Sequence, residues 1–188
     1  MRIISGIAKG KKIFYPIDKK TRPLKDLVRE SIFNIIVHSK LLKNKFNNTV
    51  VLDLFSGVGS FGLEAISRGA KKVVFFENYN PAIKLLVKNI NNLSFDNHAE
   101  VNKKDIYNKK NLTKLNYKFD LIFLDPPFKD TNLNNLLQNI EKLKLIVPET
   151  LIVMHRHKKT NDEFDKNLKV EREKIYGSSK IIFAFFNF

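Results

Sequence analysis

The sequence contains no cysteine and no tryptophan. Without cysteine the chain has no thiolate nucleophile, no thiolate ligand for a metal and no disulfide of its own. It also lacks any apolar run near the roughly 18 residues of a membrane-spanning helix, and residues 1–16 show no apolar stretch of signal-peptide length. We therefore expect a cytoplasmic protein with no membrane partner, assign it no metal site, and treat it as a monomer.

Acidic residues are scarce beside basic ones. Asp and Glu number 19 against 34 Lys and Arg, which gives a formal net charge of +15. Such an excess favours a polyanionic partner, because Lys and Arg displace condensed counterions from phosphates. Lysine far outnumbers arginine and asparagine is frequent, so the codon bias of an AT-rich genome is the alternative explanation. Charge alone therefore indicates a nucleic-acid partner without establishing one.

Strand-like and helical patterns alternate along the 188-residue chain. Short apolar runs predict parallel strands at 50–55, 73–77, 100–103, 119–124 and 151–154. Apolar residues at helical spacing predict helices at 23–39, 61–68, 80–90 and 133–143. This order predicts an α/β fold with a mostly parallel, Rossmann-like sheet and helices on both faces.

Two hairpins complete the expected architecture. Segments 168–175 and 180–188 flank a glycine turn and predict an antiparallel C-terminal hairpin, while residues 1–16 predict a small N-terminal β-hairpin with a basic face. We divide the chain into a hairpin extension, residues 1–22, and a main domain, residues 23–188.

A glycine-rich turn follows the first predicted strand. Gly57, Gly59 and Gly62 lie where the strand gives way to a helix, and glycine lets the backbone approach a ligand closely. Ligands of open α/β sheets bind at the carboxyl ends of the strands. Glu77, at the end of the second strand, suits the hydroxyls of a ribose. The pattern predicts a cofactor that contains a nucleoside.

Asp53 decides between two such cofactors. The glycine spacing also fits NAD, but a carboxylate in front of the turn would repel a pyrophosphate. The same carboxylate can accept from the ammonium group of a methionine moiety. We therefore favour S-adenosylmethionine, with further contacts from residues at or after the strand ends: Phe55, Asn78, Asp105 and Ile106.

Residues 125–128, Asp-Pro-Pro-Phe, are the most specific motif. Consecutive prolines remove two N–H donors and fix φ, which leaves backbone carbonyls near them as acceptors. The carboxylate of Asp125 and a carbonyl, that of Pro126, could accept from both N–H groups of an exocyclic amine. Phe128 offers a plane on which a base can stack. The motif predicts methylation of a base amine by in-line displacement, helped by orientation.

A resemblance to a known family rests on short segments spread over nearly the whole chain: Ile4-Ser5-Gly6, residues 9–12, 21–23, 28–30, 33–34, 52–57, 62–65 and 67–70, Glu77, Asn89, residues 125–128 and 176–177. With them the chain resembles the bacterial 16S rRNA guanine-N2 methyltransferase family of class I enzymes. The resemblance implies cofactor contacts from Asp53, Gly57, Gly59, Glu77 and Asp105 and a catalytic Asp125 with Phe128 holding the base. It also implies a hairpin that docks RNA, and 16S rRNA or a small-subunit assembly intermediate as the partner.

The expected RNA contacts are basic residues near the N-terminus: Lys9, Lys11, Lys12, Arg22 and Arg29. The sequence departs from the family at His155, where an acidic residue is usual, and at the basic residues 156–159, which suggest a different RNA-facing rim. Four histidines show no metal-ligand spacing and receive no catalytic role: His38, His98, His155 and His157.

Three alternatives stay open at this point. The same motif could methylate adenine N6 or a protein amide, although the basic surface disfavours a protein substrate. The glycine turn could serve a NAD-dependent oxidoreductase, which would leave residues 125–128 unexplained. A catalytically silent RNA-binding module would not bind S-adenosylmethionine.

Overall fold

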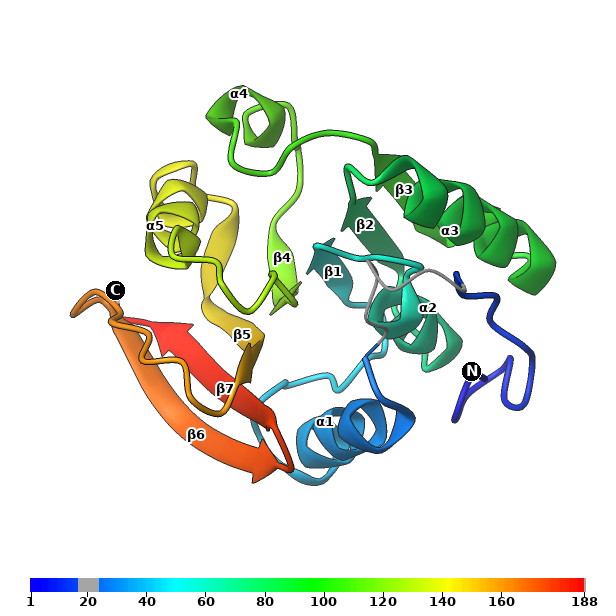
Figure 1. The fold of residues 1–188 in the computed structure, drawn as a ribbon, viewed down its shortest axis with the longest axis horizontal. Coiled ribbons are helices and arrows are strands. Elements are labelled where there is room, and N and C mark those ends of the chain that lie inside the picture. Colours follow the sequence, from blue (N-terminus) through cyan, green and yellow to red (C-terminus); the bar gives the residue numbers. More distant parts are fainter. Residues whose placement is uncertain (17–23, 188) are drawn as a thin grey trace.

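The computed structural model describes residues 1–16 and 24–187. They form a seven-stranded sheet in the order β3-β2-β1-β4-β5-β7-β6 (Figure 1). The strands are β1 (Val50–Leu54), β2 (Lys72–Phe76), β3 (Ala99–Asn102), β4 (Phe119–Leu124), β5 (Ile146–His157), β6 (Leu168–Tyr176) and β7 (Ser179–Phe186). The first five pair in parallel, and β7 is antiparallel to both β5 and β6. The predicted α/β sheet with an antiparallel C-terminal hairpin is confirmed.

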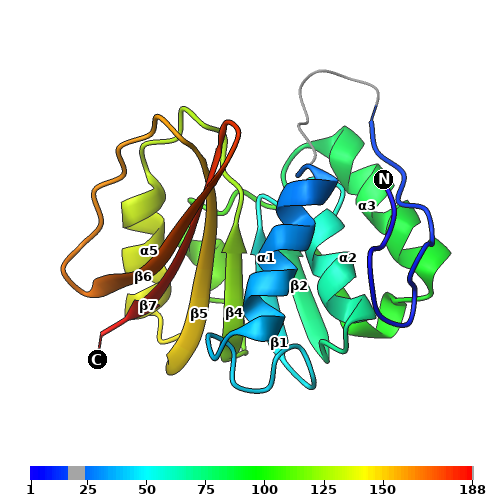
Figure 2. The same cartoon turned by 90° about the horizontal axis from the view of Figure 1, so that it is seen from below.

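Helices cover both faces of this sheet (Figures 1 and 2). The apolar cluster on one face combines side chains of α1 (Asp26–His38), α2 (Ser60–Ser67) and α3 (Asn80–Leu93). The cluster on the other face combines those of α5 (Leu133–Lys142) and the short α4 (Lys109–Leu112). No helix among the described residues is long and apolar enough to cross a bilayer.

Strand β4 shows why the parallel strands are continuous apolar runs. Leu121 and Phe123 pack with α1, α2 and α3, whereas Ile122 and Leu124 pack with α5. Successive side chains point to opposite faces, so a strand covered on both sides needs apolar residues at every position. Phe123 stacks on Phe61 of α2 with ring centroids 3.9 Å apart.

The element boundaries differ from the prediction in a few places. β5 begins at Ile146, because its first residues pair with the start of β4 before an irregularity in the register. The short helices α4 and η1 (Asp96–His98) were not predicted. α1 begins at Asp26, and the predicted helix start at residues 21–23 lies outside the described residues.

The N-terminal segment, residues 1–16, makes a small antiparallel pairing centred on a bridge between Arg2 and Lys12. Ile3, Ala8 and Ile13 are buried in the same cluster as α1 and α2, so the segment shares the main core. The predicted domain boundary, between residues 22 and 23, falls outside the described residues and stays a prediction.

Buried polar side chains attach this segment to the helices. The Glu64 carboxylate of α2 accepts from the backbone N–H groups of Ile4 and Ser5, at 2.7 and 2.9 Å. On α3, the Asn89 amide exchanges hydrogen bonds with the backbone of Phe14. Such bonds, made away from water, fix the path of the segment over the helices.

Candidate active site

The glycine turn and the Asp-Pro-Pro-Phe motif lie side by side at the carboxyl edge of the sheet. Leu54 and Leu124 are register partners at the ends of β1 and β4. The next residue, Asp125, donates its backbone N–H to the Leu54 carbonyl at 3.3 Å. The two motifs, 60 to 70 residues apart in the sequence, therefore meet at one point, as predicted for ligand binding in open α/β sheets.

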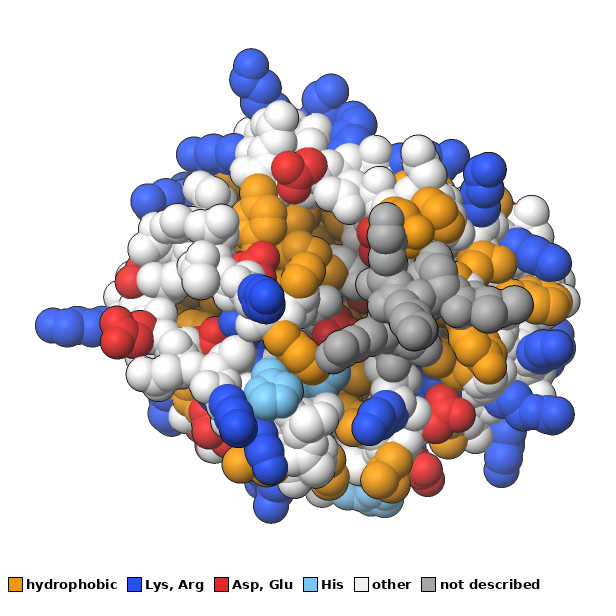
Figure 3. Space-filling model, in the orientation of Figure 1, with side chains coloured by type: hydrophobic (Ala, Val, Ile, Leu, Met, Phe, Trp, Pro, Cys, Tyr) orange, Lys and Arg blue, Asp and Glu red, His pale blue; other side chains and the backbone are white. Residues whose placement is uncertain are grey.

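Figure 3 looks onto this edge. Hydrophobic side chains gather near its middle, acidic side chains are scattered across the view, and Lys and Arg side chains lie mainly around the outline. Much of the positive charge on this face therefore surrounds the sheet edge.

Each of the three positions, Gly57, Gly59 and Gly62, has its own structural environment. At Gly62 a Cβ would lie 2.3 Å from the Phe75 ring, and at Gly59 it would lie 2.3 Å from a Leu86 methyl group. Both positions need glycine so that α2 can pack closely. At Gly57, where φ is +55°, a Cβ would meet nothing within 4 Å, so this turn borders open space. Gly57 is thus the glycine best placed to face a ligand.

Asp53 is 1% exposed and joins β1 to α2. Its Oδ2 accepts from the Gly62 N–H at 2.9 Å, whereas its buried Oδ1 has no hydrogen-bond partner among the described residues. Burial raises the pKa of this carboxyl well above its usual value, and the nearby carboxylates of Asp125 and Glu77 raise it further. A buried acceptor without a donor is costly, so the site favours a ligand that brings a cation or donor.

Glu77 follows β2 and holds the turn closed. Its Oε2 accepts from the Gly57 N–H at 2.7 Å, and its Oε1 accepts from the N–H groups of Asn78 and Tyr79. Carboxylate oxygens accept more than one hydrogen bond, so these contacts leave capacity for ribose hydroxyls. The predicted ribose contact by Glu77 and the cofactor contact by Asn78 stay predictions.

The loop after β3 brings apolar and aromatic groups to the site. Ile106 is buried, and the Tyr107 ring lies 5.8 Å from that of Phe55, whose φ of +59° is unusual for a non-glycine residue. Asp105 is exposed and accepts from the N–H of Tyr107 in its own turn. Its predicted contact with an adenine amine stays a prediction. The Tyr107 hydroxyl also donates to Asp130, and burial raises the pKa of Tyr107.

Asp125 is held by a residue that received no role in the sequence analysis. Its Oδ1 lies 2.8 Å from Nδ1 of His155, and Nε2 of that ring lies 2.8 Å from the Ser179 hydroxyl. The Phe128 ring meets the imidazole edge-on, with centroids 5.7 Å apart. Phe128 therefore lies beside the carboxylate, as a stacking platform for a base requires.

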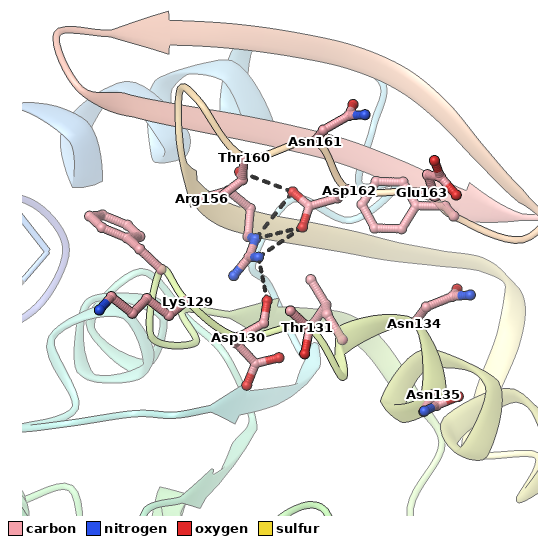
Figure 4. A pocket seen from close by; sticks show the side chains of 13 residues that line it. Lys129, Asp130, Thr131, Asn134, Asn135, Arg156, Thr160, Asn161, Asp162 and Glu163 are labelled. Carbon is pink, nitrogen blue, oxygen red and sulfur yellow. Dashed lines mark hydrogen bonds and ion pairs between the residues drawn. The ribbon is translucent and has the colours of Figure 1, made fainter.

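Arg156 fixes the loop after the prolines. It is 2% exposed, pairs with Asp162 at 2.8 Å and donates to the Asp130 carbonyl at 2.8 Å (Figure 4). It also donates to the Pro127 carbonyl at 3.3 Å. Of the basic residues 156–159, which suggested a different RNA-facing rim, Arg156 is therefore buried and does not face the surface. Since the Pro127 carbonyl is occupied, the Pro126 carbonyl is the better candidate acceptor for a substrate.

A cavity of about 580 Å³ opens next to this loop. Phe128 and Lys129 border it on one side, and Thr131, Asn135 and Glu163 are among its polar lining (Figure 4). Its lining includes Phe128 but neither Asp125 nor any residue of the glycine turn.

The basic residues predicted to contact RNA have different environments. Lys9, Lys11 and Lys12 are exposed on the N-terminal segment, and the Lys12 ammonium lies 5.5 Å from the centroid of the Phe14 ring. Arg22 lies outside the described residues. Arg29 corrects the prediction: it is 0% exposed and donates to the Arg2 carbonyl, so in this structure it anchors the N-terminal segment and contacts no solvent.

Two features in the sequence could have revealed the structural roles of His155 and Arg29. His155 follows Met154 as Asp125 follows Leu124, and the pairing of Leu124 with Met154 brings the next two side chains together. Arg29 precedes Ile32 and Phe33 by three and four positions, so it shares their buried helix face. Strand alignment and helical spacing were therefore the available signals.

A family model described as "Conserved hypothetical protein 95" matches residues 1–185. The chain belongs to this family. Among its relatives, "Ribosomal RNA small subunit methyltransferase D" of Buchnera aphidicola subsp. Baizongia pistaciae is 36% identical over 178 residues, 85% of this chain and 87% of that protein. YlbH of Bacillus subtilis, provisionally named an rRNA methyltransferase, is 34% identical over 179 residues, 94% of each chain. The predicted resemblance to an rRNA methyltransferase family is confirmed.

The fold agrees with a solved structure. The Escherichia coli protein yhhF, provisionally named a methyltransferase, superposes with a TM-score of 0.80 at 25% identity over 100% of this chain and 98% of that one. The fold is therefore that of a class I methyltransferase.

Proposed function

We propose that this protein transfers a methyl group from S-adenosylmethionine to the exocyclic N2 amine of a guanine in 16S rRNA. One observation carries the proposal: Asp125 meets the glycine turn at the sheet edge and is bound through Oδ1 only, since no described residue forms a hydrogen bond with Oδ2. A free carboxylate oxygen at this place is an acceptor for an amine held over the cofactor.

The residues present fit the cofactor. Asp53 Oδ1 is a buried acceptor that lacks a donor among the described residues, and it would take the ammonium group of the methionine moiety. Gly57 borders open space, and Glu77, Asp105 and Ile106 would hold the nucleoside. When bound, S-adenosylmethionine supplies an electrophilic methyl group on a sulfonium sulfur. No metal ion enters the proposed reaction.

The protein's own part is to bind and orient the amine. The nitrogen lone pair of a base amine is delocalised into the ring and is a poor nucleophile. Hydrogen bonds from its two N–H groups to Asp125 Oδ2 and the Pro126 carbonyl would favour a tetrahedral nitrogen and direct its lone pair, and Phe128 would hold the base by stacking. Orientation of this kind lowers a reaction barrier by several kcal/mol.

The relatives support RNA as the substrate. Proteins of Buchnera, Haemophilus influenzae and Escherichia coli that match this chain carry the name "Ribosomal RNA small subunit methyltransferase D". The net charge of +15 and the exposed Lys9, Lys11 and Lys12 agree with a polyanionic substrate. Choice of guanine N2 over adenine N6 rests on the family resemblance.

Two measurements test the proposal. S-adenosylhomocysteine should raise the melting temperature and NAD should leave it unchanged, because a ligand that binds only the folded state stabilises it. Asp125→Ala should bind S-adenosylhomocysteine like the wild type and transfer no methyl group to small-subunit rRNA. Stabilisation by NAD alone, or normal turnover of Asp125→Ala, would refute the proposed function.

A further inference from the structure

The imidazole of His155 has a partner at each nitrogen. Nδ1 lies 2.8 Å from Asp125 Oδ1 and Nε2 lies 2.8 Å from the Ser179 hydroxyl. The His155 side chain is 9% exposed, so water competes little for these bonds. The three residues come from the end of β4, from β5 and from β7, which the register of the sheet brings together. The arrangement is therefore fixed by the fold and does not depend on a loose loop.

Ser179 allows the imidazole to keep this place in either charge state. An ionised carboxylate only accepts hydrogen bonds, so Nδ1 carries a proton whenever Asp125 is ionised. A hydroxyl both donates and accepts: it donates to Nε2 of the neutral ring and accepts from Nε2–H of the cation. Asp125 Oδ1 consequently has a donor whether His155 is neutral or charged.

The electrostatic surroundings of Asp125 are otherwise acidic. The buried Asp53 lies near it, and among the described residues His155 is its only ion-pair partner. Arg156, which follows His155 in the sequence, pairs with Asp162 instead of Asp125. The Phe128 ring that faces the imidazole carries no charge.

We propose that His155 is the positioning residue of Asp125: it binds Oδ1, fixes the orientation of the carboxylate, and leaves Oδ2 for the substrate amine. This inference rests on the proposed methyl transfer. In that reaction a bond forms between the amine nitrogen and the methyl carbon while the bond from that carbon to sulfur breaks, and its electron pair stays on sulfur. The proton that leaves the nitrogen goes to Asp125 Oδ2 and then to water as the product departs.

Two substitutions separate the contacts of His155. Asparagine places its amide nitrogen near the position of Nδ1, so H155N keeps a donor to Asp125 and gives up the bond to Ser179. Glutamine reaches the position of Nε2, so H155Q keeps a partner for Ser179 and gives up the donor to Asp125. Each variant is thus the control for the other, and neither carries a charge.

The inference predicts different kinetics for the two variants. A hydrogen bond to a charged group contributes about 1.5–3 kcal/mol, so kcat of H155Q should fall about 10- to 100-fold. kcat of H155N should stay within about three-fold of the wild type at the optimal pH. KM for the RNA and the affinity for S-adenosylhomocysteine should not change in either variant, since His155 acts only through Asp125.

The split between kcat and KM supplies a readout that a merely structural role would not give, because a disturbed site would also lose affinity for the RNA or for S-adenosylhomocysteine. Equal kcat for H155N and H155Q, or a loss of either affinity that accompanies the loss of kcat in H155Q, would overturn the inference. If the wild type transfers no methyl group to small-subunit rRNA, the proposed function fails first and this inference with it.

Discussion

Gly6 and Gly10 offer a matched test of how the N-terminal segment is attached. Both have positive φ, +85° and +83°. A Cβ at Gly6 would lie 1.8 Å from the Ser67 carbonyl oxygen, a backbone atom that cannot turn away, whereas a Cβ at Gly10 would meet nothing within 4 Å. Alanine therefore imposes the same backbone strain at both positions and a steric clash at one.

The structure gives the size of the difference. Left-handed backbone costs an alanine about 1–2 kcal/mol, which is the whole expected effect of Gly10→Ala. Gly6→Ala adds about 1–3 kcal/mol of overpacking, because the same Ser67 carbonyl accepts from Ile7 N–H and cannot give way without breaking that bond. For a chain of this length, 1 kcal/mol shifts Tm by about 2–4 °C.

Urea unfolding followed by circular dichroism measures both free energies, and limited proteolysis reports release of the segment. We expect the larger loss of stability, and earlier cleavage between residues 1 and 16, in Gly6→Ala. Equal losses in the two variants would refute the inference that close packing of the segment on α2 requires glycine at this position.

Three further predictions concern charge. The folded-state pKa of Asp53 is raised, so the folded protein binds more protons than the unfolded chain above about pH 4 and loses stability as pH rises. The free energy of unfolding of Asp53→Asn, measured from pH 4 to 8, should lack this loss. Parallel curves of unfolding free energy against pH for the variant and the wild type would contradict this prediction. Arg156→Lys cannot keep all of the forked contacts and should lower kcat about ten-fold with unchanged S-adenosylhomocysteine affinity; wild-type kcat would argue against the loop clamp. Changing Lys9, Lys11 and Lys12 to Gln should reduce the slope of log affinity for RNA against log salt concentration by about 0.7–0.9 for each phosphate that these side chains neutralise. An unchanged slope would show that this surface is not part of the RNA interface.

The sequence predicted the sheet because its strands are buried on both faces. Residues 119–124, for example, are apolar at every position except Asp120, which makes the strand easy to predict. In the structure β4 has these same bounds. The motifs at the strand ends then follow, because parallel strands carry their carboxyl ends to one edge. Asp53 and Asp125 were placed together by this reasoning alone, and the structure confirms their proximity.

Contacts made by side chains across distant segments were not predictable in the same way. The clamp of Arg156 on the Pro127 carbonyl depends on the path of two loops, which no periodic pattern records. The sequence predicts Arg29 as an RNA contact, whereas the structure buries it, although arginine is seldom buried in proteins. Its position is explained by the Arg2 carbonyl and by Asp26, and the first of these requires knowledge of how residues 1–16 fold back.

The most direct test of the central claim identifies the modified nucleoside. Unmodified small-subunit rRNA is incubated with the wild type or with Asp125→Ala and with S-adenosylmethionine carrying a deuterated methyl group, and the digested nucleosides are analysed by mass spectrometry. The pair of acceptors at Asp125 and the Pro126 carbonyl predicts label on an exocyclic amine with the wild type and none with Asp125→Ala, and the family resemblance makes the labelled nucleoside N2-methylguanosine. Label on a ring nitrogen, on a ribose or on a carbon would contradict it, because those positions offer no pair of N–H donors to the two acceptors.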